Sequence, residues 1–339
     1  MHTKRSTSTR LLGLAAATTA ALAAGVMAGG PAGATSSNSA SVSDDTLTVI
    51  GSSRGEALAL RVAADGSTTL EVDFGDDGSA DESFDLTTFS SIEVFLRSGN
   101  DRFRVDEVNG TISSEDLTVY GGSGNDTLDG GAGGELFKAG SGRDTVDGNR
   151  GDDTAELGSG SDTFRWDPGD GSDVVEGRSG TDTLDFNGAN AAEIMSLSPN
   201  GGRSLFLRDV GNIRMDMDGV ERLDLIALGG PDTVTVEDMT GTDFRQADVD
   251  LSALGDDGSG DAQTDTVAVD GTERRDNVDV EADGSTVEVD GLKTTVDVTG
   301  SETIDVLQVN TLGGDDDVDV EEAARDLIGV VVDLGSGQR

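Results

Sequence analysis

The middle of the chain contains the stretch Gly121-Gly122-Ser123-Gly124-Asn125-Asp126-Thr127-Leu128-Asp129. Four more nine-residue units follow it without a break in register, and the last is Leu157-Gly158-Ser159-Gly160-Ser161-Asp162-Thr163-Phe164-Arg165. A short fixed period is typical of architectures in which each unit packs mainly against its neighbours. This stretch therefore predicts a stack of repeated units at the centre of the chain.

Three positions of the unit keep a constant chemical character. Position four is glycine in every unit, which permits a positive φ and lets the loop curl tightly. Position six is acidic, and position eight is mostly bulky and apolar. The residues at position six are Asp126, Glu135, Asp144, Asp153 and Asp162, and those at position eight are Leu128, Phe137, Val146, Ala155 and Phe164. Each unit is predicted to be a polar loop followed by a short strand with one inward side chain.

The composition restricts the fold and the partners. The 339 residues include 67 acidic and 23 basic side chains, and the resulting net charge of -44 argues against nucleic acid as a partner. Only 4% of the residues are aromatic and 49 are glycine, so a thin stacked architecture is expected rather than one thick core. The absence of cysteine excludes both disulfides and thiolate metal sites.

The first 34 residues have the composition of an export signal. Lys4, Arg5 and Arg10 precede an apolar Ala/Leu stretch, and Ala32-Gly33-Ala34 forms a small-residue cleavage site. An uncleaved membrane anchor is the alternative, which the predominance of Ala, Thr and Gly in the stretch disfavours. We expect a secreted, extracellular protein that starts at Thr35, carries a net charge of -47, and has no membrane span after signal removal.

Strands are expected on both sides of the repeats. Alternating apolar residues, such as Leu58/Leu60/Val62 before the repeats and Leu205/Leu207 after them, give the period-two signal of half-buried strands. Fragments such as Gly230-Pro231-Asp232-Thr233-Val234 resemble the repeat, so the flanks either continue the stack or form separate β-rich regions. The final Leu334–Arg339 looks like a further repeat cut short, as in a truncated product. The expected organisation is a signal peptide (1–34), a disordered leader (35–43), an N-terminal β-rich region (44–120), the repeat region (121–190) and a C-terminal β-rich region (191–339).

The block from Gly121 to Asp185 resembles the haemolysin-type calcium-binding repeats of RTX proteins, of the secreted bacterial type. The resemblance covers about 65 of the 339 residues. It implies an all-β fold with a parallel β-roll, in which the position-six carboxylates and loop carbonyls bind calcium between successive turns, and folding that calcium triggers. Two residues are inserted after Arg165 before the last two units. The implied metal-binding residues are Gly122, Gly124, Asp126, Gly133, Glu135, Gly140, Gly142, Asp144, Gly151, Asp153, Gly158, Gly160, Asp162, Gly171, Asp173, Gly180 and Asp182.

Some units depart from the family pattern. Glu135 stands where an aspartate is usual, and its longer side chain is expected to reshape the site that it shares with Asp153. Asn149 replaces the usual second glycine of its unit. Trp166, the only tryptophan, is expected to pack over the end of the roll rather than to contact a ligand. We expect about three or four competent calcium sites.

The spacing of the acids has an electrostatic consequence. If two units make one turn, acids 18 residues apart lie above one another, separated by ~4.8 Å. Asp126, Asp144 and Asp162 then form one column, and Glu135 and Asp153 form the other. Calcium takes oxygen ligands at about 2.3 to 2.6 Å, so an ion between two carboxylates spans roughly one strand spacing. Without the ion, two charges ~4.8 Å apart repel by roughly 3.5 kcal/mol at an effective dielectric constant of about 20. The empty roll is therefore expected to be unfolded or loosely ordered.

The donor types favour calcium over other metals. The repeats offer carboxylates and carbonyls without histidine or cysteine, which suits zinc and copper poorly. Magnesium prefers a tighter octahedron at about 2.0 to 2.1 Å and keeps its waters.

The sequence also allows alternatives to calcium binding. The repeat acids could be a solvated acidic face, which the strict register disfavours. Residues 73–81 resemble a calcium loop but lack the spacing of an EF-hand, so a polar hairpin turn is favoured. The only histidine is His2, inside the expected signal, which excludes a zincin site and a Ser-His-Asp triad from the mature chain. We therefore expect no enzyme, with a carboxylate-dependent carbohydrate-active enzyme as the rival. A calcium-stiffened structural protein that self-associates or lies at a cell surface is the further alternative.

Overall fold

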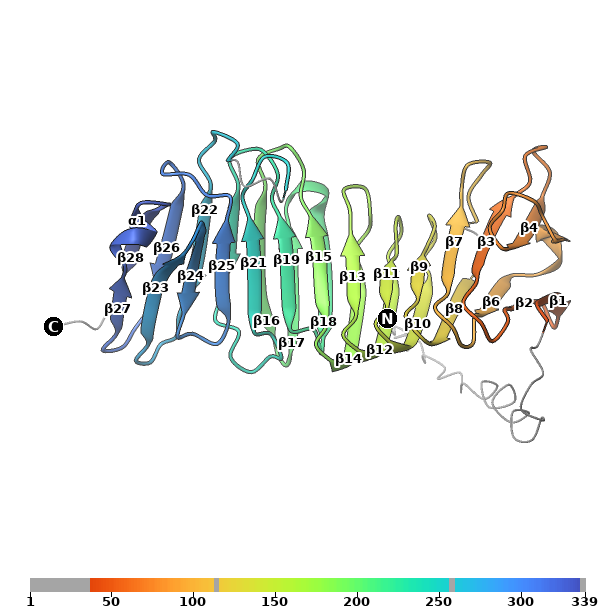
Figure 1. Cartoon of the computed structure of the whole chain (residues 1–339), viewed down its shortest axis with the longest axis horizontal. Coiled ribbons are helices and arrows are strands. Elements are labelled where there is room, and N and C mark those ends of the chain that lie inside the picture. The colour runs from red at the N-terminus through yellow and green to blue at the C-terminus, as the bar shows by residue number, and fades with distance from the viewer. Residues whose placement is uncertain (1–36, 113–115, 256–259, 336–339) are drawn as a thin grey trace, which may run out of the picture. The chain divides into compact units, whose positions relative to one another are not determined.

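The computed structural model describes residues 37–112, 116–255 and 260–335. Its described strands form two mostly parallel 14-stranded sheets, A and B, which lie in two layers (Figure 1). In order, sheet A contains β1 (Ser39–Ser43), β2 (Thr46–Ile50), β6 (Ser91–Phe95), β8 (Asp116–Ser123), β10 (Leu136–Gly142), β12 (Thr154–Gly160), β14 (Val174–Gly180), β18 (Ile213–Asp218), β17 (Arg203–Arg208), β16 (Ile194–Asn200), β20 (Thr233–Val236), β22 (Thr266–Asp270), β26 (Val306–Asn310) and β28 (Gly329–Asp333).

Sheet B has the same number of strands and covers the other side of a shared core. In order it contains β27 (Asp317–Val320), β23 (Asn277–Asp283), β24 (Thr286–Asp290), β25 (Thr295–Thr299), β21 (Gln246–Asp250), β19 (Arg222–Ile226), β15 (Thr183–Asn187), β13 (Thr163–Trp166), β11 (Thr145–Asp147), β9 (Thr127–Asp129), β7 (Arg102–Asp106), β3 (Ala57–Val62), β4 (Thr69–Phe74) and β5 (Glu82–Asp85). The described helical segments are short: η1 (Leu86–Thr88), η2 (Val210–Asn212) and α1 (Glu322–Arg325). The prediction of an all-β chain is confirmed.

The repeats pass alternately from one sheet to the other. In sheet A, Gly140 pairs with Gly122 and with Gly158, and in sheet B, Thr145 pairs with Thr127 and with Thr163. Residues 18 positions apart are thus neighbours on parallel strands, as predicted. After β13 the offset becomes 20, because the two inserted residues lie in the loop before β14.

The inward side chain of each repeat lies in the core between the sheets. The position-eight residues Leu128, Phe137, Val146, Ala155 and Phe164 are all 1% exposed or less. A threonine precedes all of them except Phe137, and these β-branched threonines favour the extended backbone. Full burial of one such large apolar side chain stabilises the fold by about 1.5 to 3 kcal/mol.

Both sheets continue into the flanking regions, so these regions extend the same stack of strands as the repeats. At three places the chain forms three consecutive antiparallel strands in one sheet before it crosses to the other. We call these segments excursions, and they are β3–β4–β5, β16–β17–β18 and β23–β24–β25. Each adds two strands to one layer before the chain crosses back. These additions make the sequence spacing of the flanks irregular.

Two predictions, one about the leader and one about a strand, are wrong. Residues 39–43 form β1, antiparallel to β2, instead of belonging to a disordered leader. Main-chain hydrogen bonding to the neighbouring strand orders this segment although most of its side chains are exposed. In β17, Phe206 is buried and Leu207 is exposed, so the predicted phase of that strand is inverted. The expected signal, residues 35 and 36, and residues 336–339 lie outside the described part of the chain.

Trp166 lies inside the stack and not at its end, which corrects the prediction. It is fully buried and stacks on Phe186, with ring centroids 4.2 Å apart. Its Nε1–H donates to the carbonyl oxygen of Gly171 at 2.9 Å, and the Arg208 guanidinium lies 5.1 Å from its ring centroid. Sheet B continues beyond Trp166 with β15 and β19. The indole therefore fills the core beside the two-residue insertion.

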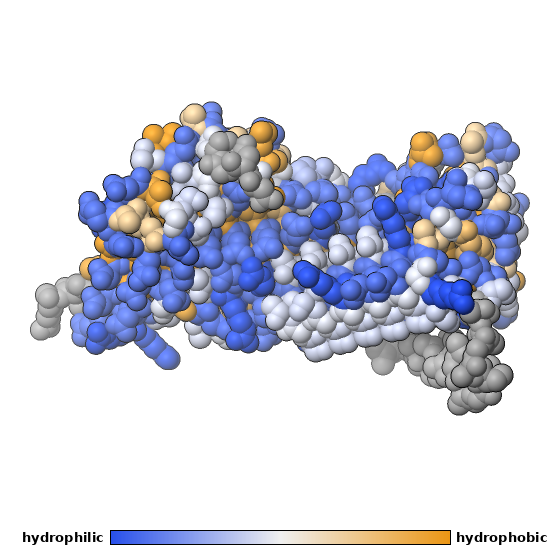
Figure 2. All heavy atoms as spheres, in the orientation of Figure 1, coloured by the Kyte–Doolittle hydropathy of each residue, from blue (hydrophilic) through white to orange (hydrophobic). Residues whose placement is uncertain are grey.

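The visible surface is mostly hydrophilic. Figure 2 shows blue residues over most of this face, with a pale band of near-neutral hydropathy along the central strands. Within the described residues, no helix combines the length and apolar character needed to cross a membrane.

Candidate metal centre

The first row of acids lies where the chain passes from sheet A to sheet B. The backbone N–H of Asp126 donates to Asp144 Oδ1 at 2.8 Å, and the N–H of Asp144 donates to Asp162 Oδ1 at 2.8 Å. The same bond joins Asp101 to Asp126 at 2.8 Å and Asp162 to Asp182 at 2.9 Å. We call this row, Asp101, Asp126, Asp144, Asp162 and Asp182, the first ladder.

A second row lies at the opposite edge, where the chain returns from sheet B to sheet A. The N–H of Glu135 donates to Asp153 Oδ1 at 2.6 Å, and the N–H of Asp153 donates to Asp173 Oδ1 at 2.8 Å. We call Glu135, Asp153 and Asp173 the second ladder. The structure thus brings together the predicted acids in the two predicted columns.

The contacts within a ladder differ from the prediction in one respect. The spacing of the acids alone predicts neighbouring carboxylates that face each other as bare charges. Instead, one oxygen of each carboxylate receives an N–H from the next turn, because the turn directs that N–H along the stacking direction. Such charge-assisted hydrogen bonds offset part of the repulsion. The expected repulsion is therefore too large as a measure of the instability of the empty fold.

The second oxygen of most ladder acids has no partner. Within the described residues, no hydrogen bond reaches the buried Oδ2 atoms of Asp101, Asp126, Asp144, Asp153, Asp162 and Asp182. These residues are 3% exposed or less. A buried polar atom without a partner is costly, and a buried charged oxygen is more so. Each of these atoms is therefore available to a proton, a water molecule or a cation.

Burial raises the pKa of the ladder acids. Desolvation, with the neighbouring carboxylates adding to it, raises the pKa of Asp144 and Asp182 to about 7 and that of Asp153 to about 9. Desolvation likewise raises the pKa of Asp101 to about 6. At neutral pH without a cation, Asp153 therefore keeps its proton, and Asp144 and Asp182 are about half protonated.

The glycines of the repeats bring carbonyl oxygens close to these acids. The five central units and the two units after the insertion each have a glycine at position four. Five of these seven glycines have φ between 123° and 147°, whereas the φ angles of Gly133 and Gly171 lie outside this range. A Cβ atom on Gly142 would lie 1.8 Å from the carbonyl oxygen of Gly124. A Cβ on Gly121 would lie 2.5 Å from the Ala139 carbonyl oxygen and 2.7 Å from Asp126 Oδ2. The space that glycine leaves open is thus bordered by an unpartnered carboxylate oxygen and a carbonyl.

Any ion held here would need backbone ligands. Among residues 37–112, 116–255 and 260–335, no three side chains of His, Cys, Asp or Glu are grouped so that they could hold a metal ion by themselves. A hard cation between two turns would draw on one or two carboxylates and on the carbonyl oxygens that line the turns. These are oxygen donors, which calcium prefers. The residues present therefore fit calcium.

Two acids in the ladders behave differently from the central aspartates. Glu135 is 4% exposed, and its longer side chain bends back so that Oε2 accepts the N–H of Gly131 at 3.0 Å. Asp101 was not predicted, although Ser98-Gly99-Asn100-Asp101 repeats the sequence Ser123 to Asp126. Asp101 and Asp126 are 25 residues apart because the intervening turn is longer, so a search for a nine-residue period passes over it.

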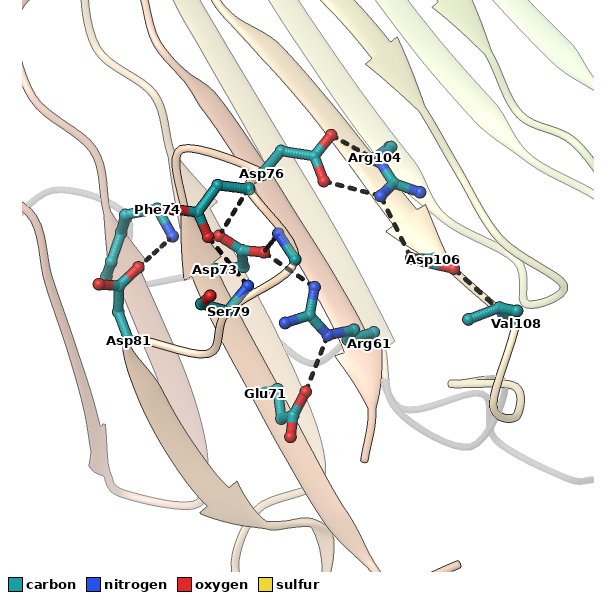
Figure 3. A network of polar contacts seen from close by, with 12 residues as sticks. Arg61, Glu71, Asp73, Phe74, Asp76, Ser79, Asp81, Arg104, Asp106 and Val108 are labelled. Atoms are coloured by element: carbon teal, nitrogen blue, oxygen red, sulfur yellow. Dashed lines mark hydrogen bonds and ion pairs between the residues drawn. The ribbon is translucent and has the colours of Figure 1, made fainter. Parts of the chain in front are cut away.

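The loop of residues 73–81 provides a contrast (Figure 3). Asp73 accepts hydrogen bonds from Arg61 Nη1 at 2.8 Å and from the N–H groups of Asp77 and Gly78 at 3.2 and 2.9 Å. Both of its oxygens are satisfied by the protein. The loop joins the antiparallel strands β4 and β5, which confirms the predicted hairpin turn.

The calcium-free fold is expected to lose stability as the pH rises from about 5 to about 8. An aspartate has a pKa of about 3.9 in an unfolded chain, whereas Asp144 and Asp182 have about 7 and Asp153 about 9 in the fold. The folded chain therefore binds protons more tightly, and this stabilisation is complete below about pH 4 and lost as the pH rises through about 7 to 9. Thermal unfolding in chelator between these pH values measures it. A calcium-free chain that gains stability over this range would contradict the assignment of these protons.

No protein-family model matches the sequence, and no curated protein matches it at a significant level.

Proposed function

We propose that the protein is a secreted, non-enzymatic calcium-binding protein whose repeats bind Ca²⁺ between successive turns of a parallel β-roll. The observation that carries this proposal is the row of buried Oδ2 atoms without a partner in the two ladders. A divalent cation would neutralise them and would complete its shell with the nearby carbonyl oxygens. The proposed ligands are the ladder acids together with carbonyls of the glycine-rich turns.

Folding and binding are coupled in this proposal. The turns that supply the ligands exist only when neighbouring units stack, so an unfolded chain has no preformed site. In the stacked state the unpartnered oxygens are buried and costly until a cation arrives. Calcium therefore stabilises the folded chain selectively, and a chain that reaches calcium-rich surroundings outside the cell would fold there.

The ion is calcium rather than magnesium because of the shape of the site. The proposed ligands come from separate turns and include main-chain oxygens, which suits an ion that tolerates an irregular arrangement of ligands. Calcium accepts 6 to 8 oxygen ligands in flexible geometry, whereas magnesium requires a near-ideal octahedron at about 2.0 to 2.1 Å. Zinc and copper prefer nitrogen or sulfur ligands.

Isothermal titration of the full chain with CaCl₂ tests the proposal. We expect several ions to bind, about three or four if only the central turns of the repeats are competent. MgCl₂ at the same concentrations is the control and is expected to give little heat. An absence of calcium-dependent heat under conditions where the chain is soluble would refute the proposal.

Trp166 should report the formation of the turn next to the second ladder. Its indole N–H donates to Gly171, two residues before Asp173, and the ring is fully buried. Calcium binding is therefore expected to shift the tryptophan emission to shorter wavelength, because the indole leaves water. An emission spectrum that already indicates a buried indole in chelator, and does not change with calcium, would show that this region folds without the ion.

A further inference from the structure

A third row of acids continues the edge of the second ladder beyond the β16–β18 excursion. The N–H of Glu193 donates to Asp232 Oδ1 at 2.8 Å, and the N–H of Asp232 donates to Asp265 Oδ1 at 2.8 Å. The N–H of Asp265 donates in turn to Asp305 Oδ1 at 3.0 Å. The hydrogen-bond pattern is that of the repeats, although these acids are 33 to 40 residues apart and no nine-residue period joins them.

The two ends of this third ladder are satisfied by the protein. Glu193 forms a buried ion pair with Arg208, and its Oε2 accepts the N–H of Ala189 at 2.8 Å. Asp305 Oδ2 accepts the N–H of Glu302 at 2.6 Å. These acids therefore need no further cation. They hold the turns on either side of Asp232 in place.

Asp232, between them, is different. It is 2% exposed, and within the described residues its Oδ2 has no hydrogen-bond partner. Burial, with the charges of Asp265, Glu193 and Asp261 adding to it, raises the pKa of Asp232 to about 7. The open, buried carboxylate oxygen of Asp232 thus lies near the further carboxylates of Asp265 and Asp261, which favours a cation.

The backbone around Asp232 has the same geometry as the glycine-rich turns of the repeats. Gly230 precedes Asp232 by two residues and has φ 137°, within the range of the repeat glycines. A Cβ on Gly230 would lie 2.5 Å from the carbonyl oxygen of Ala191 in the adjoining turn, much as a Cβ on Gly142 would meet Gly124. A shallow hollow lined by Asn190, Gly229 and Pro231, among others, opens on the outside of these turns. This hollow adjoins the loops that precede Glu193 and Asp232.

We propose that Asp232 is the carboxylate ligand of a further site for a hard divalent cation, in the C-terminal half and outside the repeats. The ion enters between the turn that ends at Glu193 and the turn that ends at Asp232, with carbonyl oxygens as the remaining ligands. The site stabilises the C-terminal half separately from the repeats. The proposal rests on the proposed function only in taking Ca²⁺ as the ion.

The test compares Asp232→Asn with the parent by calcium titration of the full chain. Asparagine keeps the Oδ1 acceptor for the Glu193 N–H but removes the charge and the open oxygen. We expect the number of bound Ca²⁺ ions to fall by one. Asp238→Asn is the matched control, because Asp238 accepts the N–H of Thr240 at 2.9 Å in a loop of the same half and is not in a ladder. Its stoichiometry should equal that of the parent.

Two further variants distinguish a failure of the Asp232 site from a failure of the repeat sites. Asp265→Asn, on the neighbouring turn, keeps the acceptor for the Asp232 N–H and is expected to weaken the same site, so the test survives if Asp232→Asn does not fold. Asp144→Asn should remove ions from the repeats only. Unchanged stoichiometry in folded Asp232→Asn, together with a reduced value in Asp144→Asn, would overturn the Asp232 site and leave the repeat sites standing. No calcium binding by the parent would overturn both.

Discussion

Asp144→Asn is expected to stabilise the chain in chelator and to destabilise it in calcium, relative to the parent. The asparagine Oδ1 still accepts the N–H of Asp126, so the rung of the ladder remains. In chelator, the substitution replaces a buried, ionisable oxygen that has no partner with a neutral amide group. In calcium, it removes a ligand that two successive sites share. At an ion concentration of about 100 times Kd, each site contributes about 2.7 kcal/mol, so losing two sites costs about 5 kcal/mol.

Thermal or urea unfolding in both conditions measures this reversal of sign. Asp152→Asn is the matched control, since it removes the same charge from an exposed residue next to Asp153, and little change is expected. Asp144→Ala also removes the acceptor of the Asp126 N–H and should be the most damaging single substitution in the ladder. If Asp144→Asn responds to calcium like the parent, the column of shared sites is wrong.

Gly142→Ala should disrupt the central turns even in saturating calcium. Gly142 has φ 139°, a sparsely populated conformation that costs an L-residue roughly 1 to 3 kcal/mol. Its Cβ would also lie 1.8 Å from the carbonyl oxygen of Gly124, which cannot move without separating two turns. We expect a loss of more than about 3 kcal/mol in unfolding free energy. The cooperativity of calcium binding should fall as well, because ligand carbonyls on adjacent turns are displaced.

Gly169→Ala separates the cost of backbone strain from the cost of the steric clash. Gly169 has φ 127°, but a Cβ there would have no atom within 4 Å. The substitution should therefore cost only the backbone strain, roughly 1 to 3 kcal/mol. Equal losses in the two variants would show that the close stacking of carbonyls at Gly142 is not needed for stability. Circular dichroism of both variants with calcium, followed through thermal unfolding, provides the comparison.

The repeats made the centre of the fold predictable. A fixed nine-residue period fixes both which residue lies inside and which residues become neighbours one turn later. Phe137 and Phe164 are buried, and Asp126, Asp144 and Asp162 form one row, because the period leaves no other consistent pairing. The hydrogen bond to Oδ1 was not predictable, since it depends on where each turn directs the N–H of its acid.

Outside the repeats, the spacing of partners depends on the length of the excursions. Asp232 and Asp265 are neighbours in space although 33 residues separate them, because a loop and a strand of each sheet intervene. The phase of β17 was inverted because Phe206 packs against Phe186, with ring centroids 4.6 Å apart, and because Arg208 points inward to Glu193. A buried arginine gives no apolar signal in the sequence, so alternation alone selects the wrong face there.

The most direct test of the central claim is the far-ultraviolet circular dichroism of the full chain in excess chelator, before and after calcium is added in excess. We predict weak β signal without the ion at about pH 8, where Asp144 and Asp182 of the first ladder lose their protons. A cooperative rise should follow with calcium and not with magnesium. A chain with its full β signal and an unchanged unfolding temperature in chelator would contradict the claim that the buried acids need calcium.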